Sequence, residues 1–119
     1  MKKPSIDWGE VMSQFIATIQ EAQQAANCQP QLTAGLKEIA AAFLGEDAGS
    51  ANVKWKVIPR GFAWTGGQPS KMSVLLCIVP DDLPSEIRAN LMTQANDLWI
   101  AETGADPNDL LIFTTSQPL

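Results

Sequence analysis

The feature that most constrains this sequence is the nearly continuous apolar run from Met72 to Val79, which ends at Pro80. A segment this short and this apolar is typical of a strand that is buried on both faces and lies at the centre of its sheet. Such a strand needs a neighbour along each edge and a covering layer. We therefore expect the rest of the chain to supply further strands and helices.

Two segments before this strand show the three- to four-residue apolar spacing that predicts helices. The first runs from about Trp8 to Ala26. The second covers 32–44, with Thr33 as a candidate N-cap and Gly45 just past its end. Because the connection between them is short, we expect an antiparallel hairpin of helices.

Three further elements complete the prediction. Residues 53–57 alternate between apolar and polar, as in a half-buried strand, and residues 110–115 form a last apolar strand. Between the strands 72–79 and 110–115, an apolar stripe predicts a helix that starts near Pro84 and ends at Gly104. Asp82 or Ser85 is its candidate cap.

These elements predict an α+β fold for one domain, 1–119, in which an N-terminal helical hairpin is followed by a β-β-α-β unit. We expect a three-stranded mixed sheet with strand 72–79 in the middle. It would pair antiparallel with 53–57 and, across a right-handed crossover, parallel with 110–115. Both outer strands would then carry unpaired backbone groups, so we expect the chain to self-associate and cover an edge or a face of the sheet.

The composition argues against several functions. The net charge of −5 argues against binding to nucleic acid or anionic membranes, and the absence of histidine excludes histidine bases and ligands. Cys28 and Cys77 match no metal or disulfide spacing and indicate free thiols in a reducing cytoplasm. No apolar run is long enough for a membrane span, and no signal-peptide core follows Met1. Without a glycine-rich phosphate motif, we expect neither a cofactor nor a metal.

Positive charge is concentrated in one stretch, and this suggests an anion site. Residues 48–80 contain no acidic residue and four basic ones: Lys54, Lys56, Arg60 and Lys71. The loop that holds Arg60 and Lys71 also carries Trp64 and a Gly-Gly pair, and such a loop can hold a small carboxylate by charge-assisted hydrogen bonds. Arg60 and Trp64 are the stronger candidates, since strand alternation does not dictate loop positions. Lys54 and Lys56 also fit the solvated face of an edge strand.

A second candidate region follows the central strand. Asp81 and Asp82 lie at its carboxyl end and before a helix, where ligands often bind in open α/β sheets. A helix cap explains the same two carboxylates.

The sequence from Val53 to residue 115 also has a family resemblance. Its features are a strand that ends at Pro59, a loop with Trp64, a helix that opens Leu83-Pro84-Ser85-Glu86, and the closing segment 103–112. This pattern resembles the tautomerase superfamily, which includes 4-oxalocrotonate tautomerase and macrophage migration inhibitory factor. In that family an N-terminal proline acts as general base and a strand follows it. Here Pro4 follows Met1-Lys2-Lys3 and precedes a helical pattern, so we expect no residue to inherit that role.

We therefore expect a small cytoplasmic protein that acts as a non-catalytic binding or assembly module. Its partners would be copies of itself and a small carboxylate, not nucleic acid or membranes. The alternative is a divergent tautomerase-like enzyme that acts on a small keto or unsaturated carboxylic acid, with Arg60 and Lys71 holding the carboxylate.

Overall fold

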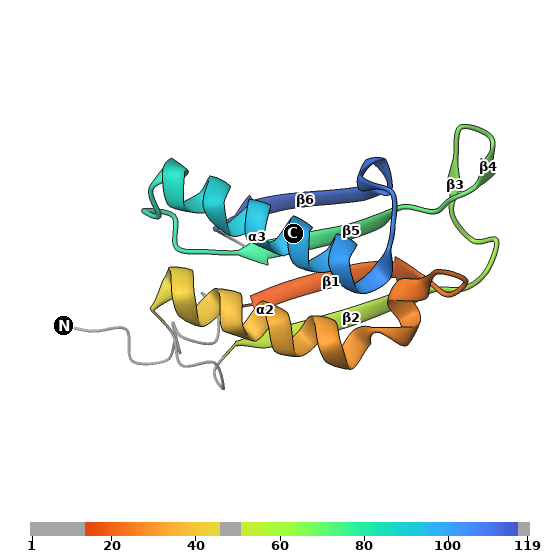
Figure 1. Ribbon diagram of the computed structural model, residues 1–119. Coiled ribbons are helices and arrows are strands. Elements are labelled where there is room, and N and C mark those ends of the chain that lie inside the picture. The colour runs from red at the N-terminus through yellow and green to blue at the C-terminus, as the bar shows by residue number, and fades with distance from the viewer. Residues whose placement is uncertain (1–13, 46–50, 117–119) are drawn as a thin grey trace, which may run out of the picture.

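The computed structural model describes residues 14–45 and 51–116, which form two successive β-α-β units joined by a small hairpin (Figure 1). The first unit consists of β1 (Gln14–Gln20), the short 3-10 helix η1 (Gln24–Asn27), α2 (Gln29–Leu44) and β2 (Asn52–Ile58). The hairpin consists of β3 (Trp64–Thr65) and β4 (Gln68–Pro69). The second unit consists of β5 (Ser73–Ile78), α3 (Ser85–Thr103), η3 (Pro107–Asp109) and β6 (Leu110–Thr115).

The four long strands form one mixed sheet in the order β2-β1-β5-β6. Within each unit the two strands are parallel, and the units meet where β1 pairs antiparallel with β5. The fold is therefore a duplicated β-α-β unit, although no repeat is evident in the sequence.

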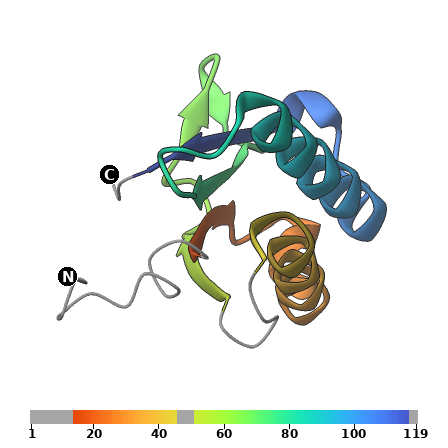
Figure 2. The same ribbon diagram turned by 90° about the vertical axis from the view of Figure 1, so that its left-hand side faces the viewer.

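Both helices pack on the same face of the sheet, as the end-on view shows (Figure 2). Alternate residues of the two central strands project into this layer, and the helices contribute one apolar face each. The fully buried core comprises Phe15, Ala17, Ile19, Leu32, Leu36, Ala40, Leu75, Cys77, Leu91, Ala95 and Trp99. The core therefore lies between the sheet and the helices.

The helix predicted from Trp8 to Ala26 is wrong over residues 14–20, which form β1; residues 8–13 lie outside the described part of the chain. The apolar residues Phe15, Ile16 and Ile19 fit helical spacing, but Phe15, Ala17 and Ile19 also alternate with period two. β-Branched side chains such as Ile16 and Ile19 favour the extended backbone. Burial of the alternating set against the helices decides between the two patterns.

The predicted helical hairpin and three-stranded sheet are wrong for the same reason. Because 14–20 is a strand, the expected antiparallel hairpin of helices does not form within the described residues, and α2 packs beside α3. β1 lies between β2 and β5, so the expected antiparallel pairing of 53–57 with 72–79 does not form. β1 instead pairs with β2 on one side and with β5 on the other, and so adds a fourth strand to the sheet.

The second half of the prediction agrees with the structure. The apolar segment 72–79 contains β5, an interior strand, which is parallel to β6 across α3. The helices predicted over 32–44 and 84–103 are present, and each ends at a glycine with positive φ, Gly45 at 69° and Gly104 at 69°. The candidate caps are wrong: Cys28 and Pro84 occupy the N-cap positions, and neither makes a side-chain cap bond. Thr33 instead accepts a 3.0 Å hydrogen bond from Trp55 Nε1.

Because Cys77 is buried, we expect the stability of this fold to decrease at alkaline pH. Cys77 is fully buried in the core, and loss of solvation raises the pKa of its thiol from 9.0 to about 12. Above pH 9 the unfolded thiol loses its proton while the folded thiol keeps it. This group therefore favours folding below pH 9, and we expect its contribution to fall by about 1.4 kcal/mol per pH unit from pH 9 to about 12.

Urea unfolding at a series of pH values measures this slope, with Cys77→Ala as the control. The control should lose less stability over the same range than the wild-type protein. Parallel slopes for the two proteins would show that Cys77 is not the group responsible.

Candidate ligand site

The hairpin between the two units brings the ends of the basic loop together. Gly66 and Gly67 form its turn with φ of 60° and 79°, the left-handed pair that a two-residue hairpin turn requires. Ser70 fixes the returning limb, because its Oγ accepts hydrogen bonds from Met72 N at 3.0 Å and from Thr65 Oγ1 at 2.7 Å. As a result Arg60, just after β2, and Lys71, just before β5, lie near each other at the base of the hairpin.

Arg60 and Lys71 line one pocket of about 360 Å³. Its wall consists of residues at and after the end of β1, two residues that follow β2, and the segment from Pro69 to Lys71: Gln20, Ala22, Gln23, Arg60, Gly61, Pro69, Ser70 and Lys71. Both basic side chains are exposed, and neither forms an ion pair or hydrogen bond within residues 14–45 and 51–116. The pocket, which we call the Arg60–Lys71 pocket, therefore presents to a ligand two cationic groups that form no ion pair within the described part of the chain.

Two hydrogen bonds hold this pocket in shape. Gln20 is only 7% exposed, and its Nε2 donates to Met72 O at 3.1 Å, which joins the end of β1 to the start of β5. Arg60 N donates to Glu21 Oε1 at 2.9 Å, which fixes the backbone of Arg60 while leaving its guanidinium available. The Glu21 carboxylate also lies beside the pocket, so an anion there would be held on the side of Arg60 and Lys71.

The other three predicted anion-site residues lie elsewhere. Trp64 Nε1 donates to Gly61 O at 3.1 Å, and the ring is 63% exposed on the hairpin, outside the pocket lining. Lys54 and Lys56 are exposed on β2 and alternate with Val53 and Trp55, which pack against the core. The two lysines thus lie on the face of the sheet away from the helices, along an edge strand.

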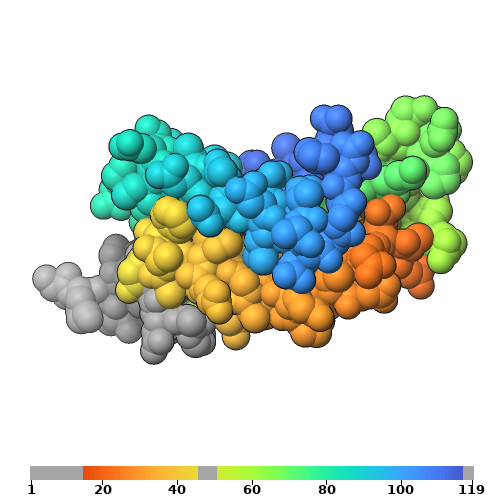
Figure 3. Space-filling view, viewed as in Figure 1, coloured from red at the N-terminus to blue at the C-terminus, as the bar shows by residue number. Residues whose placement is uncertain are grey.

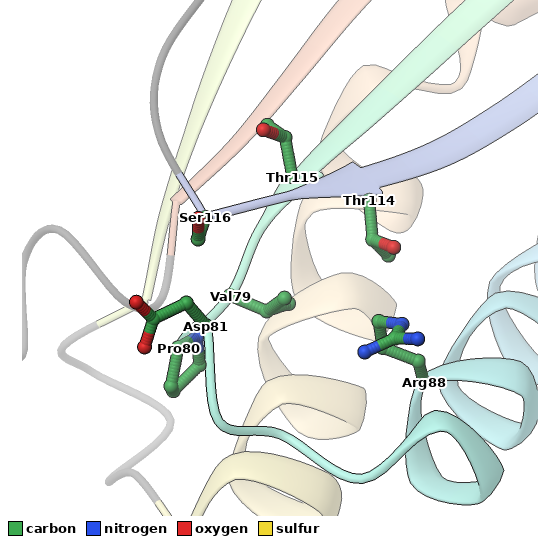
Figure 4. Close-up of a pocket in the computed structure, with 7 residues that line it drawn as sticks. All are labelled: Val79, Pro80, Asp81, Arg88, Thr114, Thr115 and Ser116. Atoms are coloured by element: carbon green, nitrogen blue, oxygen red, sulfur yellow. The ribbon is translucent and has the colours of Figure 1, made fainter.

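A second pocket, of about 270 Å³, lies at the opposite end of the sheet (Figure 4). It is lined by residues that end β5 and β6 and by one side chain of α3: Val79, Pro80, Asp81, Arg88, Thr114, Thr115 and Ser116. Arg88 Nη1 donates to Leu83 O at 2.9 Å, which holds the guanidinium in place. In Figure 4, Arg88 and Thr114 lie on the same side of β6, whereas Thr115 points away from them.

The two pockets occupy equivalent places in the duplicated fold. Each lies where the parallel strands of one unit end, and the second pocket also takes the Arg88 side chain from α3. Arg88 was not among the predicted site residues, because its pocket is completed by the distant residues 114–116. The position of Asp81 after the central strand was the available signal, and Asp81 does line this pocket.

The described residues offer no metal site and no membrane-spanning helix. Within 14–45 and 51–116, no group of three or more carboxylate or thiol side chains could hold a metal ion. None of the helices in these ranges is long and apolar enough to cross a membrane. Both cysteines are free and buried.

Solved structures share this fold at low sequence identity. Native Ps01740 is similar with a TM-score of 0.81 and 20% identity, over 88% of this chain and 94% of that one. Pt0534 inactivated by 2-oxo-3-pentynoate is similar with a TM-score of 0.76 and 16% identity, over 86% and 83%. A fused 4-OT, a symmetric trimer, is similar with a TM-score of 0.75 and 16% identity, over 88% and 85%.

These similarities show that the chain shares the fold of Ps01740, Pt0534 and the fused 4-OT over most of its length. The structural similarity covers the first β-α-β unit as well as the segment from Val53 onward. No protein-family model matches the sequence, and a search of curated proteins also found no match.

Proposed function

We propose that this protein is a self-associating, non-catalytic binding module that holds a small carboxylate in the Arg60–Lys71 pocket. The observation that carries the proposal is the convergence of two unpaired cationic side chains on one pocket, at the base of a hairpin that a Gly-Gly turn closes. A volume of about 360 Å³ suits a small organic acid.

The chemistry of the pocket favours a carboxylate over a neutral ligand. A guanidinium donates two parallel hydrogen bonds to a carboxylate, and an ammonium adds a third donor and a second positive charge. Gln20 and Ser70 already use polar groups to hold Met72. Arg60 and Lys71 are the charged donors of the lining.

We expect phenylpyruvate, a small keto acid, to bind and Arg60→Gln to weaken that binding about tenfold, because a hydrogen bond to a charged group is lost. Isothermal titration calorimetry measures the affinities. Arg88→Gln is the matched control, since it makes the same change in the other pocket and should leave the affinity within about twofold. An unchanged affinity in Arg60→Gln, or a greater loss in Arg88→Gln, would contradict the assignment of the site.

The second candidate function is a divergent tautomerase-like enzyme for small keto or unsaturated carboxylic acids. The specific observation in its favour is the fold shared with Pt0534, a protein inactivated by 2-oxo-3-pentynoate. Incubation with phenylenolpyruvate, followed by absorbance, separates the two candidates. Turnover above the buffer rate that Arg60→Gln abolishes would establish the enzyme and overturn the non-catalytic module.

The self-association is supported by the face of the sheet away from the helices, which we call the open face. Residues that alternate with the core residues of their strands belong to it, and many are apolar: Ile16, Val74, Leu76, Ile78, Leu111 and Phe113. Leu111 is 51% exposed on the edge strand β6. Leu76 and Ile78 are buried and Ile16, Val74 and Phe113 are half-buried, so Leu111 is the exposed member of this set. An exposed apolar side chain on an edge strand favours association between copies. The fused 4-OT with this fold is a trimer.

We expect sedimentation at micromolar concentration to give a mass near three times the 12.8 kDa of one chain. Leu111→Lys should shift the mass toward that of a single chain. Association would bury the new ammonium without a partner, which costs on the order of several kcal/mol. Ala34→Lys, an equal change at an exposed position of α2, should leave the assembly intact. A wild-type protein of 12.8 kDa would refute self-association.

A further inference from the structure

α2 and α3 lie side by side on the helix side of the molecule (Figures 1 and 3). A groove runs between them. Its volume is about 460 Å³. The residues that line it recur at helical spacing and so form one face of each helix: Gly35, Glu38, Ile39, Ala42 and Phe43 from α2, and Gln94, Asp97 and Leu98 from α3.

The helices are in direct contact at one end of this groove. A methyl group at Gly35 would lie 2.6 Å from both terminal carbons of Leu98, so Leu98 packs against the bare backbone of α2. Further along α2, Ile39 and Phe43 pack against the core but remain partly exposed, and Ala42 is exposed. The groove therefore has an apolar floor that the chain's own described residues do not fully cover.

Acidic groups flank this floor on both sides. Glu38 projects from α2 and Asp97 from α3, both are exposed, and no basic residue among those described lines the groove. Neither carboxylate forms an ion pair or hydrogen bond in the described part of the chain. An occupant that complements this surface must combine apolar side chains with positive charges beside them.

We propose that this groove binds a cationic amphipathic helix of a partner protein. A third helix can place apolar side chains from one face between two packed helices, by the same ridge and groove geometry that packs helices in a core. Lysine or arginine residues beside that apolar face would meet Glu38 and Asp97. An anionic membrane surface is disfavoured, because the same two carboxylates would repel it.

The groove is independent of the proposed carboxylate site and of the proposed self-association. It lies on the helix side, whereas the open face is on the other side of the sheet, so an assembly through the open face leaves the groove accessible. Arg60 and Lys71 do not line it.

The synthetic peptide LKKLLKLLKKLLKL, which forms an amphipathic cationic helix, tests the proposal by fluorescence anisotropy with the full-length protein. We expect Ala42→Lys to weaken binding about tenfold or more, because the added side chain fills the groove and repels the peptide. Ala34→Lys places the same residue at an exposed position of α2 outside the groove and should change the affinity by about twofold at most.

Three outcomes would overturn the proposal. The first is an equal loss of affinity in Ala42→Lys and Ala34→Lys, which would reflect overall charge. The second is equal binding of LEELLELLEELLEL, which keeps the apolar pattern but reverses the charge. The third is a sedimentation coefficient of the Glu38→Gln/Asp97→Gln double variant that is lower than that of the wild-type protein. That result would mean that a second copy occupies the groove.

Discussion

The antiparallel pairing of β1 with β5 is the interaction on which the rest of this structure depends. It matches Gln14 to Ile78 at one end and Thr18 to Val74 at the other, and it is the only pairing between the two β-α-β units in the described sheet. Without it each unit is a pair of parallel strands with one helix, too small to bury a core. The pairing also places both helices on one face of the sheet.

The same pairing decides where ligands can be held. Because the two units run in opposite directions, the carboxyl ends of their parallel strands lie at opposite ends of the sheet. One end carries Arg60 and Lys71, and the other carries Arg88 and Asp81. The two units therefore provide one pocket at each end of the sheet. The first pocket is lined by two basic side chains, and the second is lined by one basic and one acidic side chain. This divergence within one chain is the basis for assigning the carboxylate to a single pocket.

Sequence patterns predicted the second unit because its information is local. The apolar run 72–79, the helical stripe before Gly104 and the turn at 106–109 are adjacent in the chain, and a crossover between neighbouring strands has a preferred hand. The first unit required knowledge of tertiary contacts. Residues 14–20 satisfy both helical and strand periodicity, and only their position between β2 and β5 distinguishes the two. Similarly, charge segregation pointed to Arg60 and Lys71, whereas Arg88 became a candidate only once β6 was placed beside β5.

Two-dimensional NMR of isotopically labelled protein tests most directly whether residues 14–20 are the strand that joins the units. Ala17 is paired with Trp55 of β2 on one side and with Leu75 of β5 on the other. Backbone cross-strand contacts from Ala17 to both residues are the expected result. The contradicting result is a helical pattern through 14–20: strong contacts between sequential amides, contacts between residues three positions apart, and none from Ala17 to Leu75. It would overturn the sheet order and with it the placement of both pockets.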